Sequence, residues 1–265
     1  MSGQVDLKSQ SQLATMRKAG RIVWEILQEM AAAAQVGVST QEIDRLAEAR
    51  TREKGALPAF KGYRGFPASV CISLNQEVVH GIPSKKRKLK SGDLVKLDFG
   101  VILDGLFGDS AITVPVGEVS PEAQRLIDVT RESMHRGIAM MVPDKRLHDI
   151  GHAVQAHVER AGFSVVRDFV GHGIGHQLHE DPQLPNYGTA GTGMRLKAGM
   201  CLAIEPMVNV GTYEVEVLRD GWTAVTADGA LSAHFEHSVA IGPNGPEILT
   251  LPEGVAPGRE GKRAA

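Results

Sequence analysis

Four acidic residues stand in apolar segments, where a carboxylate is unfavourable unless a cation lies beside it. Asp98 and Asp109 lie in KLDFGVIL and FGDSAITV, and Glu205 and Glu236 lie in LAIEPMV and FEHSVAI. Moving one ionised carboxylate out of water costs several kcal/mol. One such acid alone is equally well explained as an outward-facing strand position, but four together repel one another and raise each other's pKa. The set therefore predicts a site for a multivalent metal ion.

A segment rich in glycine and histidine, FVGHGIGHQLHEDPQLPNYG at residues 169–188, contains His172, His176 and His179. It lacks the third glycine of the dinucleotide-binding fingerprint, and no glutamate follows His172 as the zinc-protease helix motif requires. Glycines on both sides of a histidine favour a strand or loop whose backbone lies close to a ligand. We therefore expect this segment to border a binding site, with three histidines on a surface loop as the alternative.

Similar segments occur in the two halves of the chain, which indicates how the acids are brought together. A shift of 107 residues aligns LKSGDLVKLD at 89–98 with LKAGMCLAIE at 196–205, so Asp98 and Glu205 take the same position in an apolar strand. Each of these strands has a later partner strand that carries a further acid. A duplicated half related by a pseudo-twofold axis therefore predicts one shared cluster.

Four helices are expected to surround these strands. Capping boxes formed by Ser9 with Gln12 and by Ser39 with Glu42 predict helix starts, and the second helix is expected to stop at Gly55. A third helix is expected between Pro121 and Pro143, and a fourth from Leu147 to Gly162. Segments rich in β-branched residues predict strands at 70–74, 93–103, 111–117, 201–211 and 235–242.

This pattern predicts the fold class α/β (α+β) and a single domain over residues 9–252, with halves at about 9–119 and 120–252. Residues 1–8 are expected to form an amino-terminal tail. Residues 253–265 have few large apolar side chains and are expected to form a flexible carboxy-terminal tail.

The composition of the chain restricts the classes of binding partner and the cellular compartment that we expect. The net charge of −2 over 265 residues gives no general field for a polyanion or an anionic membrane, so no specific nucleic acid and no membrane partner are expected. The chain has two distant cysteines, no Asn-x-Ser/Thr sequence and no apolar leader, which favours a cytoplasmic protein. The basic run SKKRKLK at 84–90, which includes Lys85 to Lys90, is expected to be a solvated loop, with a contact to ribosomal RNA near a nascent chain as the alternative.

Taken together, these motifs resemble those of the type I methionine aminopeptidases of the bacterial, extension-free kind. The similarity rests on GHGIG with His172, IEPMVN with Glu205, DGWT with Trp222, FEHS with Glu236 and the two acids of KLDFGVILDGLFGDS, and it covers residues 9–252 in order. The resemblance implies the pita-bread fold of the M24 family, with a central antiparallel sheet, helices outside and a pseudo-twofold axis. It also implies hydrolytic removal of the amino-terminal methionine from nascent polypeptides whose second residue is small.

The resemblance implies a dinuclear metal site on Asp98, Asp109, His172, Glu205 and Glu236. Asp109 and Glu236 are then the bridging ligands, Asp98 completes one metal, and His172 with Glu205 completes the other. Glu205 is also the implied acid/base, His179 the donor to the developing oxyanion, and His80 the residue that orients the substrate amide. The ions are two divalent cations of Co, Mn, Fe, Ni or Zn, because oxygen ligands with one imidazole suit all five.

The same resemblance implies a methionine pocket that contains Tyr63, Phe66, Cys71, Leu178 and Trp222, together with His80 and His179. Phe66, Phe60 and Leu178 depart from residues common in the family, with Leu178 expected in the strand before His179, and these changes keep the pocket apolar. His176 is expected to contact solvent or other residues around the site. The alternatives are a related pita-bread X-Pro peptidase and a non-enzymatic binding protein, and we expect a monomer.

Overall fold

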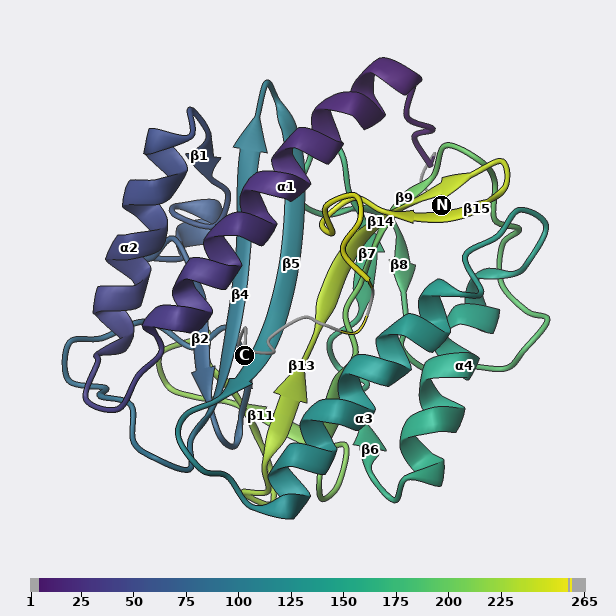
Figure 1. The fold of residues 1–265 in the computed structure, drawn as a ribbon. Helices are drawn as coiled ribbons and strands as arrows, with labels where there is room; N and C mark the ends of the chain where they lie inside the picture. Colours follow the sequence, from purple (N-terminus) through teal and green to yellow (C-terminus); the bar gives the residue numbers. More distant parts are fainter. Residues whose placement is uncertain (1–4, 257, 259–265) are drawn as a thin grey trace.

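The structure is a computed structural model that describes residues 5–256 and 258 (Figure 1). Four α-helices cover one side of a curved antiparallel sheet: α1 (Gln10–Ala33), α2 (Thr40–Glu53), α3 (Pro121–Ile138) and α4 (Leu147–Arg160). Both predicted capping boxes are present, because the hydroxyl oxygens of Ser9 and Ser39 accept from the backbone N–H of Gln12 and Glu42. The predicted starts of all four helices are therefore confirmed. The third helix ends before Pro143, at Ile138.

Nine strands form the main sheet, in the order β1-β4-β5-β14-β9-β7-β8, with β2 beside β4 and β15 beside β14. All pairs in it are antiparallel. Its members are β1 (Leu57–Pro58), β2 (Cys71–Leu74), β4 (Leu94–Leu103), β5 (Leu106–Pro115), β7 (Gly171–Gly173), β8 (Glu180–Leu184), β9 (Cys201–Ile204), β14 (Glu236–Gly242) and β15 (Gly245–Ile248). The pairs β4/β5 and β9/β14 lie on either side of the β5/β14 contact.

Two smaller sheets flank the main one, with the orders β13-β10-β6 and β11-β12-β3. Their strands are β3 (Glu77–Val79), β6 (Ser164–Val165), β10 (Met207–Asn209), β11 (Val215–Val217), β12 (Ala224–Thr226) and β13 (Ser232–His234). A short 3-10 turn at Tyr63–Gly65 precedes β2.

Two strand predictions differ from the structure. Residues 201–211 form two strands, because Pro206 lacks a backbone N–H and the chain leaves the main sheet there to pair with β13 and β6. Strand β5 begins at Leu106, five residues earlier than predicted. A two-residue turn makes this extension possible, since Asp104 and Gly105 both have positive φ angles, which match the twist of a tight hairpin.

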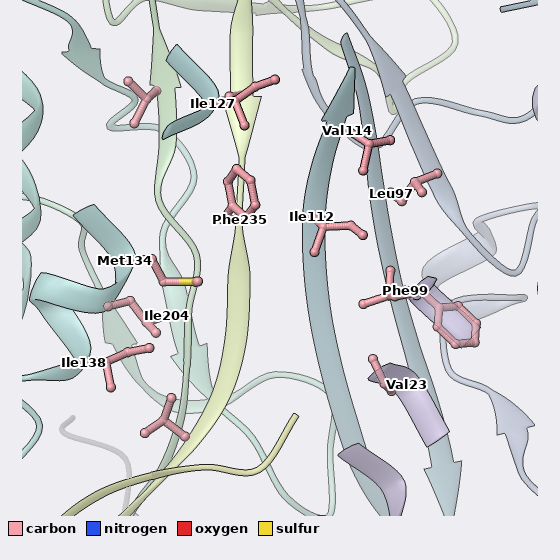
Figure 2. Packing of buried hydrophobic residues seen from close by; sticks show 14 of the residues in the cluster. Val23, Leu97, Phe99, Ile112, Val114, Ile127, Met134, Ile138, Ile204 and Phe235 are labelled. Atoms are coloured by element: carbon pink, nitrogen blue, oxygen red, sulfur yellow. The ribbon is translucent and has the colours of Figure 1, made fainter. Parts of the chain in front are cut away.

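Alternation along the strands separates an apolar face from a polar one. Leu97 and Phe99 of β4 and Ile112 and Val114 of β5 are buried on the face toward the helices, where Val23 of α1 packs (Figure 2). Farther along this face, the core continues to Phe235 and Ile204 and to the α3 side chains Ile127, Met134 and Ile138. Successive strand side chains point to opposite faces, so the residues between these core positions face away from the helices.

The predicted tails lie partly outside the described residues, which omit 1–4, 257 and 259–265. Residues 5–8 precede α1, and Lys8 among them is buried. The division of residues 9–252 into two halves stays a prediction. In the described part of the chain, no helix combines the length and the apolar character needed to cross a membrane.

Candidate metal centre and active-site pocket

Strand register brings three of the four acids onto one face of the main sheet. Ala111 of β5 is paired on one side with Asp98 of β4 and on the other side with Glu236 of β14. Residues directly opposite each other in antiparallel strands project from the same face. Asp109 lies two positions before Ala111, so it shares that face as well. The small side chain of Ala111 leaves the space between the three carboxyl groups open.

The other half of the sheet adds the histidine and the fourth acid. Ala203 of β9 pairs with Ser238 of β14 and with His172 of β7, which places His172 on the same face as Glu236. Glu205 follows directly after β9, and its Oε1 lies 3.4 Å from Nε2 of His172. One ligand atom each from Asp109, His172 and Glu236 lie within 4.8 Å of one another.

The carboxyl groups lack the partners that buried charges need. Asp109 and Glu236 are only 4% and 2% exposed, and among the described residues Oδ1 of Asp109 and Oε1 of Glu236 have no hydrogen-bond partner. Burial raises the pKa of Asp98 to about 7. Burial, followed by the charges of neighbouring acids, raises the pKa of Asp109, Glu205 and Glu236 well above their ordinary values. Buried carboxyl groups without hydrogen-bond partners do not stabilise an apolar core, so this cluster calls for a functional explanation.

This donor set fits a divalent cation. Four carboxyl groups and one imidazole supply oxygen ligands and one nitrogen ligand. The His172 ring can donate from Nδ1 to the backbone carbonyl of Gly173 at 2.8 Å, which leaves the lone pair of Nε2 for a metal. Burial lowers the pKa of His172 to about 3, so its ring is neutral near pH 7, as a ligand must be.

A cavity of about 300 Å³ opens beside the cluster, and every site residue predicted from the sequence lines it. These residues are Tyr63, Phe66, Cys71, His80, Asp98, Asp109, His172, Leu178, His179, Glu205, Trp222 and Glu236. Phe60, Arg64 and Phe169 also line it. The sequence analysis assigned no role to Arg64 or Phe169, because neither belongs to a motif with a chemical signature.

The wall of the cavity next to the acids is apolar. Cys71 pairs with Asp98 across β2 and β4, so the apolar wall begins directly beside the acid cluster. Phe66, Leu178 and Phe60 are buried there, and the ring of Phe66 meets Trp222 edge to face at 5.2 Å. Leu178 lies in the bend between β7 and β8, not in a strand, because the chain leaves β7 after Gly173.

His80 is fixed between aromatic rings at the edge of the cavity. It adopts a left-handed backbone conformation with φ of 60°, and its ring lies edge-on to Phe169 at 5.4 Å and to Trp222 at 6.3 Å. Burial lowers the pKa of His80 to about 4. The ring is therefore neutral near pH 7 and can donate one hydrogen bond without bringing a positive charge to the site.

His179 lies at the mouth of the cavity, with its ring centroid 4.3 Å from that of His172. Its Nδ1 is 2.8 Å from the hydroxyl of Tyr63. When that hydroxyl donates to Nδ1, the ring hydrogen is on Nε2, which becomes a donor. Loss of solvent around the ring, followed by the charge of Arg64, lowers the pKa of His179, so the neutral form is favoured.

Two further histidines lie near the site. His176 is exposed, and its Nε2 is 2.8 Å from Nε2 of Gln12 in α1, outside the 300 Å³ cavity. His234 of β13 is buried, and its Nε2 is 3.8 Å from Oε2 of Glu205. The sequence analysis missed His234, because a histidine in a short strand has no local signal that distinguishes it from a core residue.

The sequence is similar to characterised families along most of its length. A model of metallopeptidase family M24 matches residues 14–243. The methionine aminopeptidase of Clostridium acetobutylicum is 54% identical over 247 residues, covering 93% of this chain and 99% of that protein. Methionine aminopeptidase 1 of Bacillus subtilis is 51% identical over 243 residues, covering 92% of this chain and 98% of that protein.

Solved structures extend the comparison. A methionine aminopeptidase from Thermotoga maritima has a TM-score of 0.92 at 47% identity, covering 93% of this chain and 99% of that one. A prolidase from Pyrococcus furiosus has a TM-score of 0.75 at 21% identity, covering 93% of this chain and 66% of that one. At 21% identity the likeness shows a common fold alone.

Proposed function

This chain belongs to metallopeptidase family M24, and from that membership we propose how its pocket removes an amino-terminal methionine from a polypeptide. Its activity is that of a methionine aminopeptidase, a hydrolase of the exopeptidase class, as in relatives 54% and 51% identical over almost the whole chain. The predicted pita-bread fold is confirmed. The relatives favour this activity over an X-Pro peptidase, whose structures share only the fold, and over a non-enzymatic binding protein.

Asp98, Asp109, His172, Glu205 and Glu236 are the residues that would hold the metal. Family membership implies divalent cations, and the unpartnered carboxylate oxygens support the assignment. We propose two ions, drawn from Co, Mn, Fe, Ni or Zn, which these five residues would hold. When bound, such ions lower the pKa of a water molecule and polarise the scissile carbonyl.

Three side chains of the protein complete the reaction. Glu205 accepts the proton of the attacking water and later returns it to the leaving amine. His179 donates from Nε2 to the oxyanion that develops on the carbonyl, with Tyr63 holding the ring in the required tautomer. His80 donates to the substrate from between Phe169 and Trp222 and orients the scissile amide. Neutral rings at both positions supply hydrogen bonds without repelling the cations.

The apolar wall selects the side chain of the first residue. Cys71, Phe66, Leu178 and Trp222 surround a narrow space that suits an unbranched thioether, which is flexible and polarizable. The acid cluster lies at one end of this space. When the free amino group of a substrate binds at the cluster, the first peptide bond, which is the scissile one, lies beside it. His80 and His179 flank the exit, which restricts the second residue to a small one.

The setting of the reaction is also part of the proposal. The described cysteines Cys71 and Cys201 are free and buried, which suits a reducing compartment such as the cytoplasm. The substrates are amino termini of nascent polypeptides. Within the 84–90 run, Lys85, Lys86, Lys88 and Lys90 are exposed, whereas Arg87 bonds to Glu77. The exposed lysines fit the expected solvated loop, with a contact to ribosomal RNA as the alternative. We propose that the protein acts as a monomer.

A single observation carries the proposal: an acid cluster, with two carboxyl oxygens that lack a hydrogen-bond partner among the described residues, lies directly against a cavity of about 300 Å³ that has an apolar wall. The test uses purified protein loaded in turn with each candidate metal, with bound metal counted. Met-Gly-Met is expected to release methionine, whereas Met-Lys-Met, Leu-Gly-Met and acetyl-Met-Gly-Met stay intact. Protein treated with a chelator is the control. Efficient release of leucine, or cleavage that requires proline at the second position, would contradict the proposed specificity.

A further inference from the structure

Lys8 is a buried ammonium group that joins the segment before α1 to the bend carrying two pocket residues. Its side chain is 0% exposed, and its Nζ lies 2.7 Å from Oδ2 of Asp6 and 2.7 Å from Oε2 of Glu180. The backbone N–H of Lys8 also donates to the carbonyl of Gly199 at 2.8 Å. Lys8 and Glu180 are separated by 172 positions in the sequence, so this contact forms only in the folded chain.

Glu180 uses its second carboxylate oxygen to shape the bend. Its Oε1 accepts from the backbone N–H of His176 at 2.6 Å and from that of Gln177 at 3.0 Å. One carboxylate therefore closes the turn with one oxygen and binds Lys8 with the other. Hydrogen bonds from N–H groups to a charged acceptor are stronger than those to a neutral one, so the fixed charge keeps the turn closed.

The backbone of the bend lies directly on the lysine. A Cβ atom at Gly175 would stand 2.0 Å from Cε of Lys8, so a larger residue there would displace the end of the lysine side chain. The carbonyl of Gly175 accepts from the N–H of Phe107 in β5 at 2.9 Å, which fixes the other side of the bend. Leu178 and His179 follow within four residues and line the cavity. Their positions therefore depend on a turn that is held between β5 and Lys8.

We propose that Lys8 is a positioning residue for the reaction: by neutralising Glu180, it holds the 174–179 bend so that His179 meets the substrate carbonyl. This inference rests on the proposed function, in which His179 donates to the oxyanion. Lys8 is not among the described residues that line the cavity, so on this proposal it acts through Glu180 and the turn.

A positioning role is distinguished from general stabilisation by turnover per folded enzyme. Removing the charge of Lys8 leaves the Glu180 carboxylate without its cation, so the free energy of unfolding is also expected to fall. Correct placement of a catalytic donor is sensitive to shifts near 1 Å. Turnover is therefore measured on the folded fraction, where a fall in kcat reports the position of the turn.

The test replaces Lys8 with methionine, which keeps the length of the side chain and removes the charge. Lys8→Met is expected to lower kcat by roughly 10-fold to 10²-fold with KM within about threefold. The reason is that the weakened contact, from His179 to the oxyanion, is made in the transition state. Hydrogen exchange of the His176 and Gln177 amides is expected to become faster. Arg17→Met is the matched control, since it removes the α1 ion pair to Glu247 without touching the bend. Arg17→Met is expected to change neither kcat nor the exchange rates of these two amides.

A double variant distinguishes positioning from a loss of stability. In a His179→Ala background, Lys8→Met is expected to cause no further fall in kcat, because the group that Lys8 positions is already gone. An equal fall in both backgrounds would show that Lys8 acts on the whole enzyme, and unchanged kcat and exchange in Lys8→Met would likewise overturn the inference. Lys8→Gln, which keeps a hydrogen-bond donor, carries the same test if the methionine variant does not fold. An inactive wild-type enzyme would overturn the proposed function itself, whereas an active one with an indifferent Lys8 overturns only this inference.

Discussion

Strand β4 passes through two buried charged regions whose hydrogen bonding differs sharply. Lys96, which is 1% exposed, donates from Nζ to the backbone carbonyls of Asn75 at 2.7 Å and of Ser232 at 2.8 Å. Two residues further on the same face, Asp98 enters the acid cluster, where oxygens of Asp109 and Glu236 have no hydrogen-bond partner among the described residues. A buried polar group with its bonds complete supports the fold, whereas one left incomplete needs a ligand.

Lys96 shows how a buried amino group can be accommodated without a carboxylate. Burial lowers its pKa to about 7, and a neutral amine still has two hydrogens, enough for both carbonyl acceptors. The bonds connect the turn at Asn75, which has a left-handed φ of 52°, to strand β13. In the acid cluster, by contrast, Oδ1 of Asp109 and Oε1 of Glu236 find no donor within the part of the chain that the structure describes, which suits a site for a cation.

The largest expected effect comes from neutralising one acid of the cluster. Glu236→Gln is expected to lower turnover at saturating metal by about 10³-fold or more, because a metal ligand contributes several kcal/mol to catalysis. The free energy of unfolding of the metal-free variant is expected to equal or exceed that of wild type, since an unpartnered buried carboxyl is removed. Peptide kinetics and urea unfolding measure the two effects. Retention of a tenth of the turnover would contradict the assignment of Glu236.

Lys96→Met is expected to show the opposite balance. It removes the Lys96 donor from the buried carbonyl of Ser232, whereas the carbonyl of Asn75 still accepts from the backbone N–H of Ser232. The free energy of unfolding is therefore expected to fall by about 1 to 3 kcal/mol. Turnover per metal-loaded, folded enzyme is expected to stay within tenfold of wild type. Urea unfolding, with kinetics on the folded fraction, tests this. If the free energy of unfolding were unchanged while turnover fell by more than tenfold, Lys96 would have a role in the reaction, as the acids do.

The acid cluster also predicts how metal-free protein responds to pH. Burial raises the pKa of Asp98 from 3.8 to about 7, so the folded state holds its proton more tightly than the unfolded chain does. The stability from this group is complete below pH 3.8 and is lost as the pH rises to 7. Between pH 4 and 7, metal-free wild type is expected to lose on the order of 1 to 3 kcal/mol relative to Asp98→Asn. Urea unfolding at several pH values measures the difference, and a gap that stays constant with pH would argue against it.

The smallest effect is expected at an exposed charge. Arg136 and Glu132 form an ion pair on the surface of α3, with side chains 50% and 54% exposed. Arg136→Ala is expected to change the free energy of unfolding by less than about 0.5 kcal/mol, because exposed pairs gain little in water. Thermal unfolding at low and high salt provides the check. A larger loss of free energy of unfolding would mean that burial does not determine how much a charged residue contributes to stability in this protein.

Local signals in the sequence were enough to predict the helix starts, whereas the members of the cavity wall were predicted from the resemblance to a known family. The hydroxyl of Ser39 and the carboxylate of Glu42 act within one turn, so their roles can be read from spacing. The acids were predictable because a carboxylate in an apolar strand is conspicuous. Their assignment as metal ligands stays a prediction, as do the roles of His80 and His179.

Contacts between distant segments could not be predicted. Lys96 bonds to carbonyls, which every residue has, so no residue type identifies its partners. Lys8 and Glu180 are ordinary surface residues by type, and the chain between them must fold before they meet. Leu178 was placed in a strand by the family resemblance, and this was wrong. It lies in a bend because the Glu180 carboxylate, at the start of the next strand, accepts from the backbone N–H groups of His176 and Gln177.

The place of β14 in the main sheet has a consequence for the order of events during synthesis. It pairs with β5, made more than a hundred residues earlier, and with β9, and Glu236 is its first residue. A growing chain that stops short of β14 lacks both the strand joining β5 to β9 and one acid of the cluster. Closing so long a loop is slow compared with forming the helices. The acid cluster is therefore completed late. On the proposed assignment of Glu236 as a metal ligand, the amino terminus of an unfinished chain can be processed only by a finished copy of the enzyme.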